Sequence, residues 1–259
     1  MSRGLGDVYK RQSRAGTTRR RSWPRASPAS NALGLPARIG LFLATVLAII
    51  ALAVLPLLTP WFIHTALDAA SSADRLGLTA AQTQALSDRS VEQLVLGPGD
   101  FLIEGPDGDL FYDSDERGHL ADARLLLGIF LIVGGVSLLG LALASLRWRD
   151  RREAMWTAIR RAGLTTAIFV VALGSISLVA FDSLFTLFHR VFFPGGNWSF
   201  DPTTQRLVQL YPFAFWQVAA AALGILVFLL GLITWLLGRW LSTREADEPG
   251  GSTPTATSG

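Results

Sequence analysis

The chain has 259 residues, of which 50% are hydrophobic and only 17% charged, a composition typical of a membrane protein rather than a soluble domain. It has no cysteine, which excludes disulfides, thiolate metal sites and cysteine nucleophiles. The formal net charge of +3 hides an uneven distribution, because the basic residues gather in particular segments.

The first 37 residues have no periodic apolar pattern, so we predict a disordered basic arm over residues 1–37. Within it, Gly4–Gln12 resembles a translated cloning adapter rather than native sequence. Nine Arg and Lys residues precede residue 39. Basic arms bind nucleic acid in some proteins, but beside a first membrane span they are more typical of a cytoplasmic flank. We therefore predict no nucleic-acid partner.

Four segments are apolar over the length, about 20 residues, that a membrane span requires. A signal peptide is the alternative for Arg38–Ala53, but the apolar run continues to Phe62 and no clear small-residue cleavage site follows. The sequence predicts an all-α membrane protein whose four-helix domain occupies residues 38–241, with a disordered tail over 242–259. The predicted spans are Ile39 to about Ile63, Leu125 to about Leu146, Leu164 to about Phe188, and about Pro212 to Leu237.

The distribution of Arg and Lys predicts the orientation, because cytoplasmic flanks are rich in both. Residues 147–161 hold six arginines, whereas residues 60–122 hold three arginines against twelve acids. The connection between the last two spans holds two arginines. We expect both termini in the cytoplasm and two outer loops, residues 64–123 and 189–211.

The first outer loop is predicted to be structured. Thr79-Ala80-Ala81-Gln82 is a capping-box pattern, in which the Thr and Gln side chains satisfy free amides at a helix start. Gly97-Pro98-Gly99 then ends the helical pattern. The apolar face of the resulting helical hairpin would comprise Leu78, Leu86, Val91, Leu94 and Val95.

Two short extended pieces, Phe101–Ile103 and Asp109–Tyr112, flank the turn signal Gly105-Pro106-Asp107-Gly108 and favour a β-hairpin. After it, Ser114 or Asp115 is expected to cap a helix that passes through His119 and becomes the second span.

The chain has three histidines, His64, His119 and His189, and each lies near the predicted outer end of a span. Converging spans would bring the three imidazoles to one level, where histidine can accept and return a proton near neutral pH. One alternative is that a histidine or arginine near a helix end merely reaches the interface. Another is a three-histidine zinc site, which is less favoured because no HExxH pattern is present.

Further ionisable residues accompany these histidines. Asp122 is three residues after His119 on the same helix face, and a carboxylate there can orient an imidazole. Asp182 interrupts an apolar run and is expected to orient His189 through a water or to pair with Arg190 or Arg206. Arg190 is a permanent cation suited to a phosphate, an ester oxygen or an oxyanion.

Several motifs together resemble one family. The segment Phe188–Phe193 has the form FHxxFF, Asn197–Pro202 contains W-x-x-DP, and Leu210–Pro212 places a proline before the aromatic pair Phe215-Trp216. His119–Asp122 has the form HxxD just before the second span. These motifs resemble the family of four-span integral membrane proteins that includes the lipoprotein intramolecular transacylase, over roughly residues 39–238.

The resemblance implies a membrane acyltransferase of the bacterial cytoplasmic membrane. It would move an acyl chain from the diacylglyceryl group of a lipoprotein to its N-terminal cysteine amine at the outer leaflet, without a cofactor or metal. Its partners would be diacylated lipoprotein N-termini and membrane lipid. His64 matches none of the motifs. The motifs imply His119, His189 and Asp122 as catalytic residues, and we predict Arg190, Tyr211, Trp198 and Asp182 as substrate-binding residues.

Two other functions compete with the acyltransferase. A non-enzymatic envelope protein would bind a partner through its outer loops and would leave the histidines apart and solvated, whereas an enzyme needs them close together. A transporter is disfavoured, because only Asp182 interrupts the spans and no broken helix with paired Gly or Pro is predicted.

Overall fold

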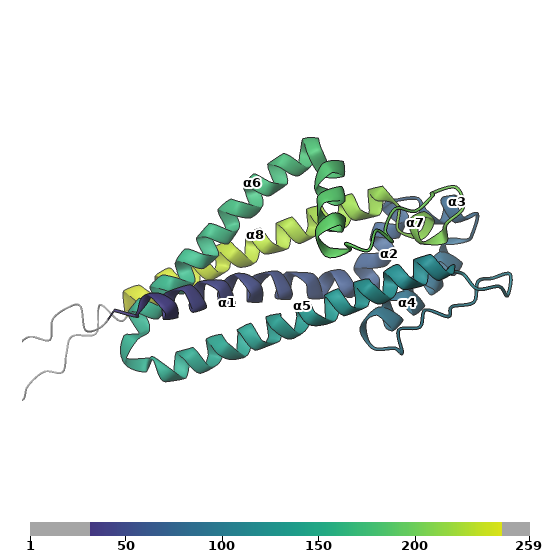
Figure 1. Ribbon diagram of the computed structural model, residues 1–259. Helices are drawn as coiled ribbons and strands as arrows, with labels where there is room; N and C mark the ends of the chain where they lie inside the picture. Colours follow the sequence, from purple (N-terminus) through teal and green to yellow (C-terminus); the bar gives the residue numbers. More distant parts are fainter. Residues whose placement is uncertain (1–31, 245–259) are drawn as a thin grey trace, which may run out of the picture. The chain divides into compact units, whose positions relative to one another are not determined.

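The computed structural model describes residues 32–244, and every regular element in that range is helical (Figure 1). The predicted arm and tail therefore lie almost wholly outside the described residues. The elements are α1 (Leu35–Val54), η2 (Leu55–Leu58), α2 (Pro60–Ala69), α3 (Ser72–Leu76), α4 (Ala80–Val95), α5 (Ser114–Arg147), η3 (Arg149–Arg151), α6 (Arg152–Phe192), α7 (Arg206–Leu210) and α8 (Phe213–Arg244).

Four of these helices are long and apolar enough to cross a membrane, as predicted: Leu35–Leu58, Ser114–Arg147, Arg149–Phe192 and Phe213–Ser242. The first ends earlier than expected. Pro56 lies in a 3₁₀ turn and Thr59 has extended backbone with φ −80° and ψ 144°. The Thr59 hydroxyl then accepts a hydrogen bond from the Phe62 amide and begins a separate helix, α2. His64 thus belongs to α2 and not to the first span.

Small residues let the long helices approach closely. Helix α6 packs most extensively against α8, and a Cβ at Gly163 of α6 would lie 2.7 Å from the carbonyl oxygen of Gly231 in α8. Helix α1 packs against α5, where a Cβ at Gly134 would collide with Ala51. Helices α5 and α6 contact each other much less, and they are joined through η3 at the ends remote from the histidines.

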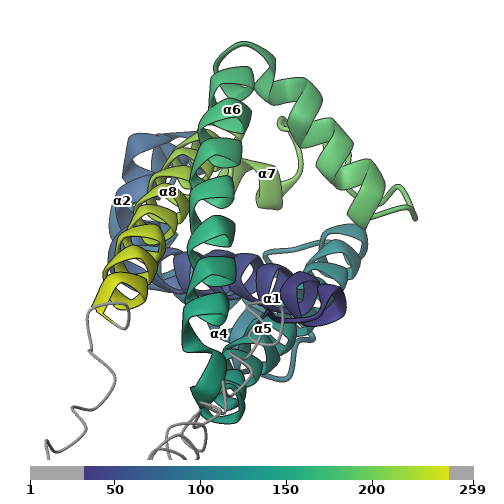
Figure 2. The same ribbon diagram turned by 90° about the vertical axis from the view of Figure 1, so that its left-hand side faces the viewer.

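Helix α6 is broken at Ala180, whose backbone has φ −135° and ψ 31° (Figures 1 and 2). The expectation of unbroken spans is therefore wrong for the third. Just before the break, the hydroxyls of Ser175 and Ser177 donate to the carbonyls of Val171 and Leu173, both at 2.9 Å. Such bonds bend helices, and adjacent Gly174 weakens this one further. The break turns residues 181–192 back toward the outer part of α5.

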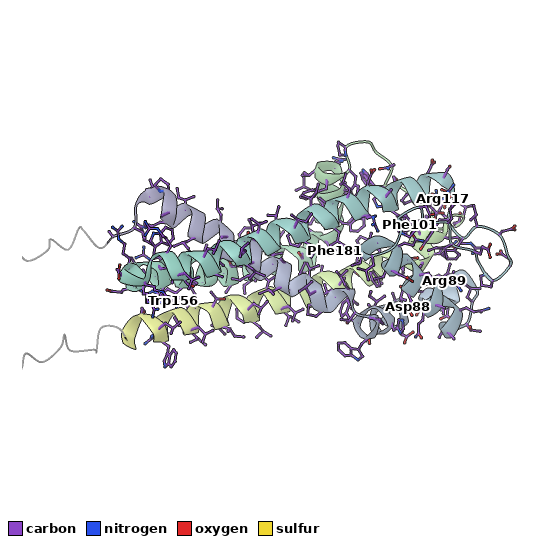
Figure 3. The ribbon with its side chains drawn as sticks, turned by 90° about the horizontal axis from the view of Figure 1, so that it is seen from below. Asp88, Arg89, Phe101, Arg117, Trp156 and Phe181 are labelled. Carbon is purple, nitrogen blue, oxygen red and sulfur yellow. The ribbon has the colours of Figure 1, made fainter. Side chains whose placement is uncertain are left out.

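The two loops predicted to lie outside, residues 64–123 and 189–211, form a packed layer around α2, α3, α4 and α7, which is called the outer layer below. Its core contains fully buried Phe101, Tyr112, Leu67 and Leu210, together with Phe215 from the start of α8. Figure 3 shows Phe101 and Arg117 in this layer, with Trp156 at the opposite end of the helices and Phe181 between the two. This layer packs around the start of α5 and the end of α6, where His119 and His189 lie.

Local predictions for this layer hold in part. The capping box of Thr79 and Gln82 is present, and α4 ends before Gly97 as expected. Leu86 is buried, but Val95 is 37% exposed and does not belong to the apolar face. The predicted hairpin is reduced to a single antiparallel bridge between Glu104 and Leu110.

The N-cap of α5 is also different from the prediction, because Asp113 takes the place expected for Ser114 or Asp115. Its carboxylate accepts from the amides of Asp115 and Glu116, both at 2.9 Å. Asp113 is preferred because its extended backbone places its carboxylate beside these free amides.

Candidate functional site

His119 of α5 and His189 of α6 face each other near the outer ends of their helices. Their ring centroids are 6.0 Å apart and their planes differ by 24°, so the imidazoles are stacked. His189 is buried and His119 half-buried. Of the three histidines, the structure brings these two together.

Aromatic rings enclose the pair. Phe193 lies 4.5 Å from His119 and 5.5 Å from His189, measured between ring centroids, while Phe200 meets His119 edge-on at 5.5 Å. Phe185 and Trp198 lie 4.2 Å and 5.2 Å from His189. These rings exclude water from one side of both imidazoles, so a proton carried between them and a substrate would move in an apolar environment.

One hydrogen bond assigns the tautomer of neutral His189. Its Nδ1 lies 2.8 Å from the carbonyl oxygen of Phe185, one helical turn earlier. Because a carbonyl only accepts, Nδ1 carries the hydrogen and Nε2 keeps its lone pair. His119 differs, because its Nδ1 is buried without a hydrogen-bond partner among the described residues. The ring of His119 therefore keeps an unused polar atom at the site.

Asp122 does not hydrogen-bond to either imidazole, so the expectation that it orients one directly is not met. Its Oδ2 instead accepts a hydrogen bond of 2.9 Å from Nδ2 of Asn197, in the loop after α6. One helical turn separates Asp122 from His119, and Asn197, in a turn of the loop after α6, occupies the carboxylate instead. Asn197 belongs to the segment that contains W-x-x-DP, but its residue type alone predicted no role for it.

His64 lies apart from the other two histidines. Its Nε2 is 2.8 Å from Oδ1 of Asp88 in α4, and both side chains are partly exposed. The expected convergence of three imidazoles is therefore wrong, because Thr59 begins a new helix that directs His64 toward α4. Within residues 32–244, no group of three His, Cys, Asp or Glu side chains is arranged to hold a metal.

The residues predicted to bind the substrate do not all lie beside the histidine pair. Trp198 packs on His189. Arg190 and Asp182 are exposed on the last segment of α6, and among the described residues neither has a hydrogen bond or ion pair. Arg206, the other expected partner of Asp182, donates instead to Gln209 at 3.2 Å.

Tyr211 does not reach the imidazoles. Its hydroxyl lies 2.9 Å from the hydroxyl of Ser87 in α4, and its ring packs 5.0 Å from Phe215. Burial raises the pKa of Tyr211 to about 12, so the phenol stays protonated at neutral pH. Tyr211 is placed to hold α4 against the start of α8 rather than to contact an oxyanion beside the histidines.

The loop after α6 is fastened to α5 by two further carboxylates. Buried Glu116 accepts from the amide of Leu207 at 2.6 Å, and Asp113 accepts from the side-chain amide of Gln205 at 3.0 Å. Burial alone would raise the pKa of Asp113, but hydrogen bonds from two α5 amides and from Gln205 outweigh it and lower the pKa. This stabilising cap is thus present at neutral pH and weakens as the pH falls through the lowered pKa.

The outer layer also holds a cavity of about 620 Å³, lined by Asp107, Tyr112, Glu116, Arg117 and Arg206 among others. Neither His119 nor His189 lines it. Beside the histidines the surface is apolar and open, with Phe188 46% exposed and Phe192 49% exposed. In a membrane such a surface faces lipid, so a lipid-linked group can approach the imidazoles from the side.

Comparison with known proteins agrees with this arrangement. The family model described as lipoprotein intramolecular transacylase Lit matches residues 39–216, more than half of the chain. The chain belongs to the lipoprotein intramolecular transacylase family.

Among proteins similar to this Lit family member is an uncharacterised protein of Aquifex aeolicus, 26% identical over 165 residues, which are 63% of this chain and 68% of that protein. The solved structure of the transacylase Lit from Bacillus cereus is similar with a TM-score of 0.68 and 20% identity, over 81% of this chain and 95% of that one. A variant of it with one histidine replaced by arginine gives a TM-score of 0.67 and 19% identity, over 82% and 93%. The fold is thus the Lit fold.

Proposed function

We propose that this Lit family member is an acyltransferase that moves an acyl chain from the diacylglyceryl group of a lipoprotein to the amine of its N-terminal cysteine. The observation that carries the proposal is the stacked pair of His119 and His189, with 6.0 Å between ring centroids, beside an open apolar surface. A partner-binding scaffold has no need of two imidazoles held so close.

The reaction divides between the two imidazoles. The cysteine amine attacks the ester carbonyl carbon and gives a proton to Nε2 of His189, whose lone pair the Phe185 carbonyl keeps free. His189 passes that proton to His119, and His119 gives it to the glyceryl oxygen as the carbon–oxygen bond breaks. The amide forms, the glyceryl hydroxyl is released, and both rings end in the neutral state in which they began. No cofactor is consumed.

The remaining predicted residues would bind the substrate. Trp198 packs on His189 and carries an indole N–H that can donate to the ester or the oxyanion. Arg190 and Asp182 flank His189 on the same helical segment and would contact the polar head of the lipoprotein. The acyl chains would lie against the exposed rings of Phe188 and Phe192.

The test is expression of the chain in a bacterium whose lipoproteins remain diacylated with a free amine. Mass spectrometry of a reporter lipoprotein should show the N-acyl, mono-acylglyceryl form, with an unchanged total mass and an acyl group on the cysteine nitrogen. A reporter that keeps its free amine in the presence of inserted protein would overturn the proposal.

We further propose that the chain lies in the bacterial cytoplasmic membrane with both termini in the cytoplasm and the site at the outer leaflet. Because the chain has no cysteine, single cysteines report the topology without background. Asp74→Cys, in exposed α3, should react with a membrane-impermeant maleimide in intact cells. Asp150→Cys, in exposed η3, should react only after the membrane is opened, and the reverse pattern would invert the orientation.

A further inference from the structure

Two amide side chains bridge the loop after α6 to α5, and they differ in one respect. Gln205 donates its Nε2 to Asp113 at 3.0 Å, and its Oε1 accepts from the amide of Asp201 at 2.7 Å, so both ends are satisfied. Asn197 donates its Nδ2 to Asp122 at 2.9 Å, but its Oδ1 is buried without a partner among the described residues. Only the second bridge leaves a buried acceptor unused.

The direction of the Asn197 amide follows from its partner. A carboxylate oxygen accepts and cannot donate, so the NH₂ group must face Asp122 and the oxygen must face away from it. A buried acceptor without a donor is unfavourable, and folded proteins keep few of them. Asp122 therefore fixes the Asn197 oxygen as an acceptor that an N–H or O–H group of a bound ligand can satisfy.

Asn197 lies beside the histidine pair. Its partner Asp122 is one turn after His119, and the next residue, Trp198, packs on His189 at 5.2 Å. An added Cβ at Gly118, the residue before His119, would lie 4.0 Å from Nδ2 of Asn197. Nδ1 of His119 is a second buried atom without a partner in this part of the chain. These two buried polar atoms without a partner thus lie on residues that are both close to the histidine pair.

We infer that Asn197 Oδ1 is the acceptor that binds and orients the primary amine of the substrate, with Asp122 fixing the amide of Asn197. This rests on the proposed acyl transfer, in which the cysteine amine brings N–H groups to the site. One N–H donates to Asn197, which aims the nitrogen lone pair at the ester carbon, while a second proton passes to His189. Asp122 acts through Asn197 and is a positioning residue.

The first test compares two variants, Asn197→Ala and Gln205→Ala, in the reporter assay. Asn197→Ala should slow formation of the N-acyl product by about tenfold to a hundredfold, the cost of one hydrogen bond to a polar or charged group. Gln205→Ala removes the matched bridge, whose oxygen is already satisfied, and should change the rate by less than about threefold. Equal losses in the two variants would reduce Asn197 to a loop tether and overturn the inference.

A reciprocal exchange separates positioning from catalysis by Asp122. Asn197→Asp alone places two carboxylates together and should be nearly inactive. Combined with Asp122→Asn, the new amide at position 122 can donate to the new carboxylate at position 197, whose other oxygen still faces the substrate amine. The double variant should recover much of the lost activity. No recovery, with normal insertion and folding, would overturn the inference.

Binding gives a readout that does not depend on turnover. In a His189→Ala background, a diacylglyceryl-cysteine lipopeptide with a free amine should bind several-fold tighter than its N-acetylated form, and Asn197→Ala should remove that preference. If wild-type protein forms no N-acyl product, the proposed function fails. If it forms product and Asn197→Ala forms as much, only the amine site fails.

Discussion

His119→Ala and His189→Ala are each expected to lower the rate of N-acyl lipoprotein formation by at least about a hundredfold, the usual contribution of a positioned acid or base. The two rings are stacked at 6.0 Å, and each would carry out a different step of the same proton transfer. Because both act on one reaction, the double variant should lose little more than either single variant. Mass spectrometry of the reporter lipoprotein measures the product.

The third histidine supplies the control. His64→Ala removes a contact with Asp88 on partly exposed surface, so product formation should stay within about twofold of the parent chain. The His119→Ala and His189→Ala variants should both insert normally, because neither imidazole makes a hydrogen bond that holds two helices together. Product at the parent rate in either variant would remove that histidine from the mechanism.

Glu116→Ala is expected to destabilise the outer layer by about 3 kcal/mol, because it removes two charged hydrogen bonds and leaves their amides without partners. The Glu116 side chain is 1% exposed, and it accepts from Leu207 at 2.6 Å and from Asp113 at 2.8 Å. Without it, α7 loses its hydrogen bond to α5, and the loop that carries Trp198 keeps only the bonds from Asn197 and Gln205. Thermal unfolding in detergent and limited proteolysis of residues 194–211 measure the effect.

Two comparisons separate this effect from a general charge effect. Asp115→Ala removes an exposed acid from the same helical turn and should cost less than about 1 kcal/mol, the usual helix-dipole contribution. Glu116→Gln keeps one acceptor oxygen and should fall between the two. A Glu116→Ala protein that unfolds and resists protease like its parent would show that the carboxylate does not fasten the loop.

The membrane architecture could be predicted from the sequence because hydropathy and length act locally. The four spans, the passage of one helix through His119 and the capping box at Thr79 all follow from a few neighbouring residues. The break at Ala180 could not be predicted in the same way. Ser175 and Ser177 bond their own helix in many straight spans, and whether they bend it depends on the packing around them.

The part of the candidate site that depends on the position of each histidine along its helix could be predicted from the sequence. His119 and His189 were expected to meet, and they do. Contacts that depend on competition between partners were not predictable. Asp122 binds Asn197 rather than an imidazole, and Tyr211 binds Ser87 across a sequence separation of 124 residues. The 3₁₀ turn Leu55–Leu58 and the new helix that begins after Thr59 also direct His64 away from the other histidines. No pattern in the sequence shows which of several nearby polar side chains forms the hydrogen bond.

The break in α6 has a consequence for how the protein responds to heat. Residues 152–179 are gripped by α8 through the close approach of Gly163 and Gly231, whereas the segment carrying His189 lies beyond the break. That segment packs on the start of α8 only through rings such as Phe181 and Phe185, and the loop after it is hydrogen-bonded to α5. Warming should therefore misalign the two rings while the bundle is still intact, so the proposed activity would be lost several degrees before the protein unfolds.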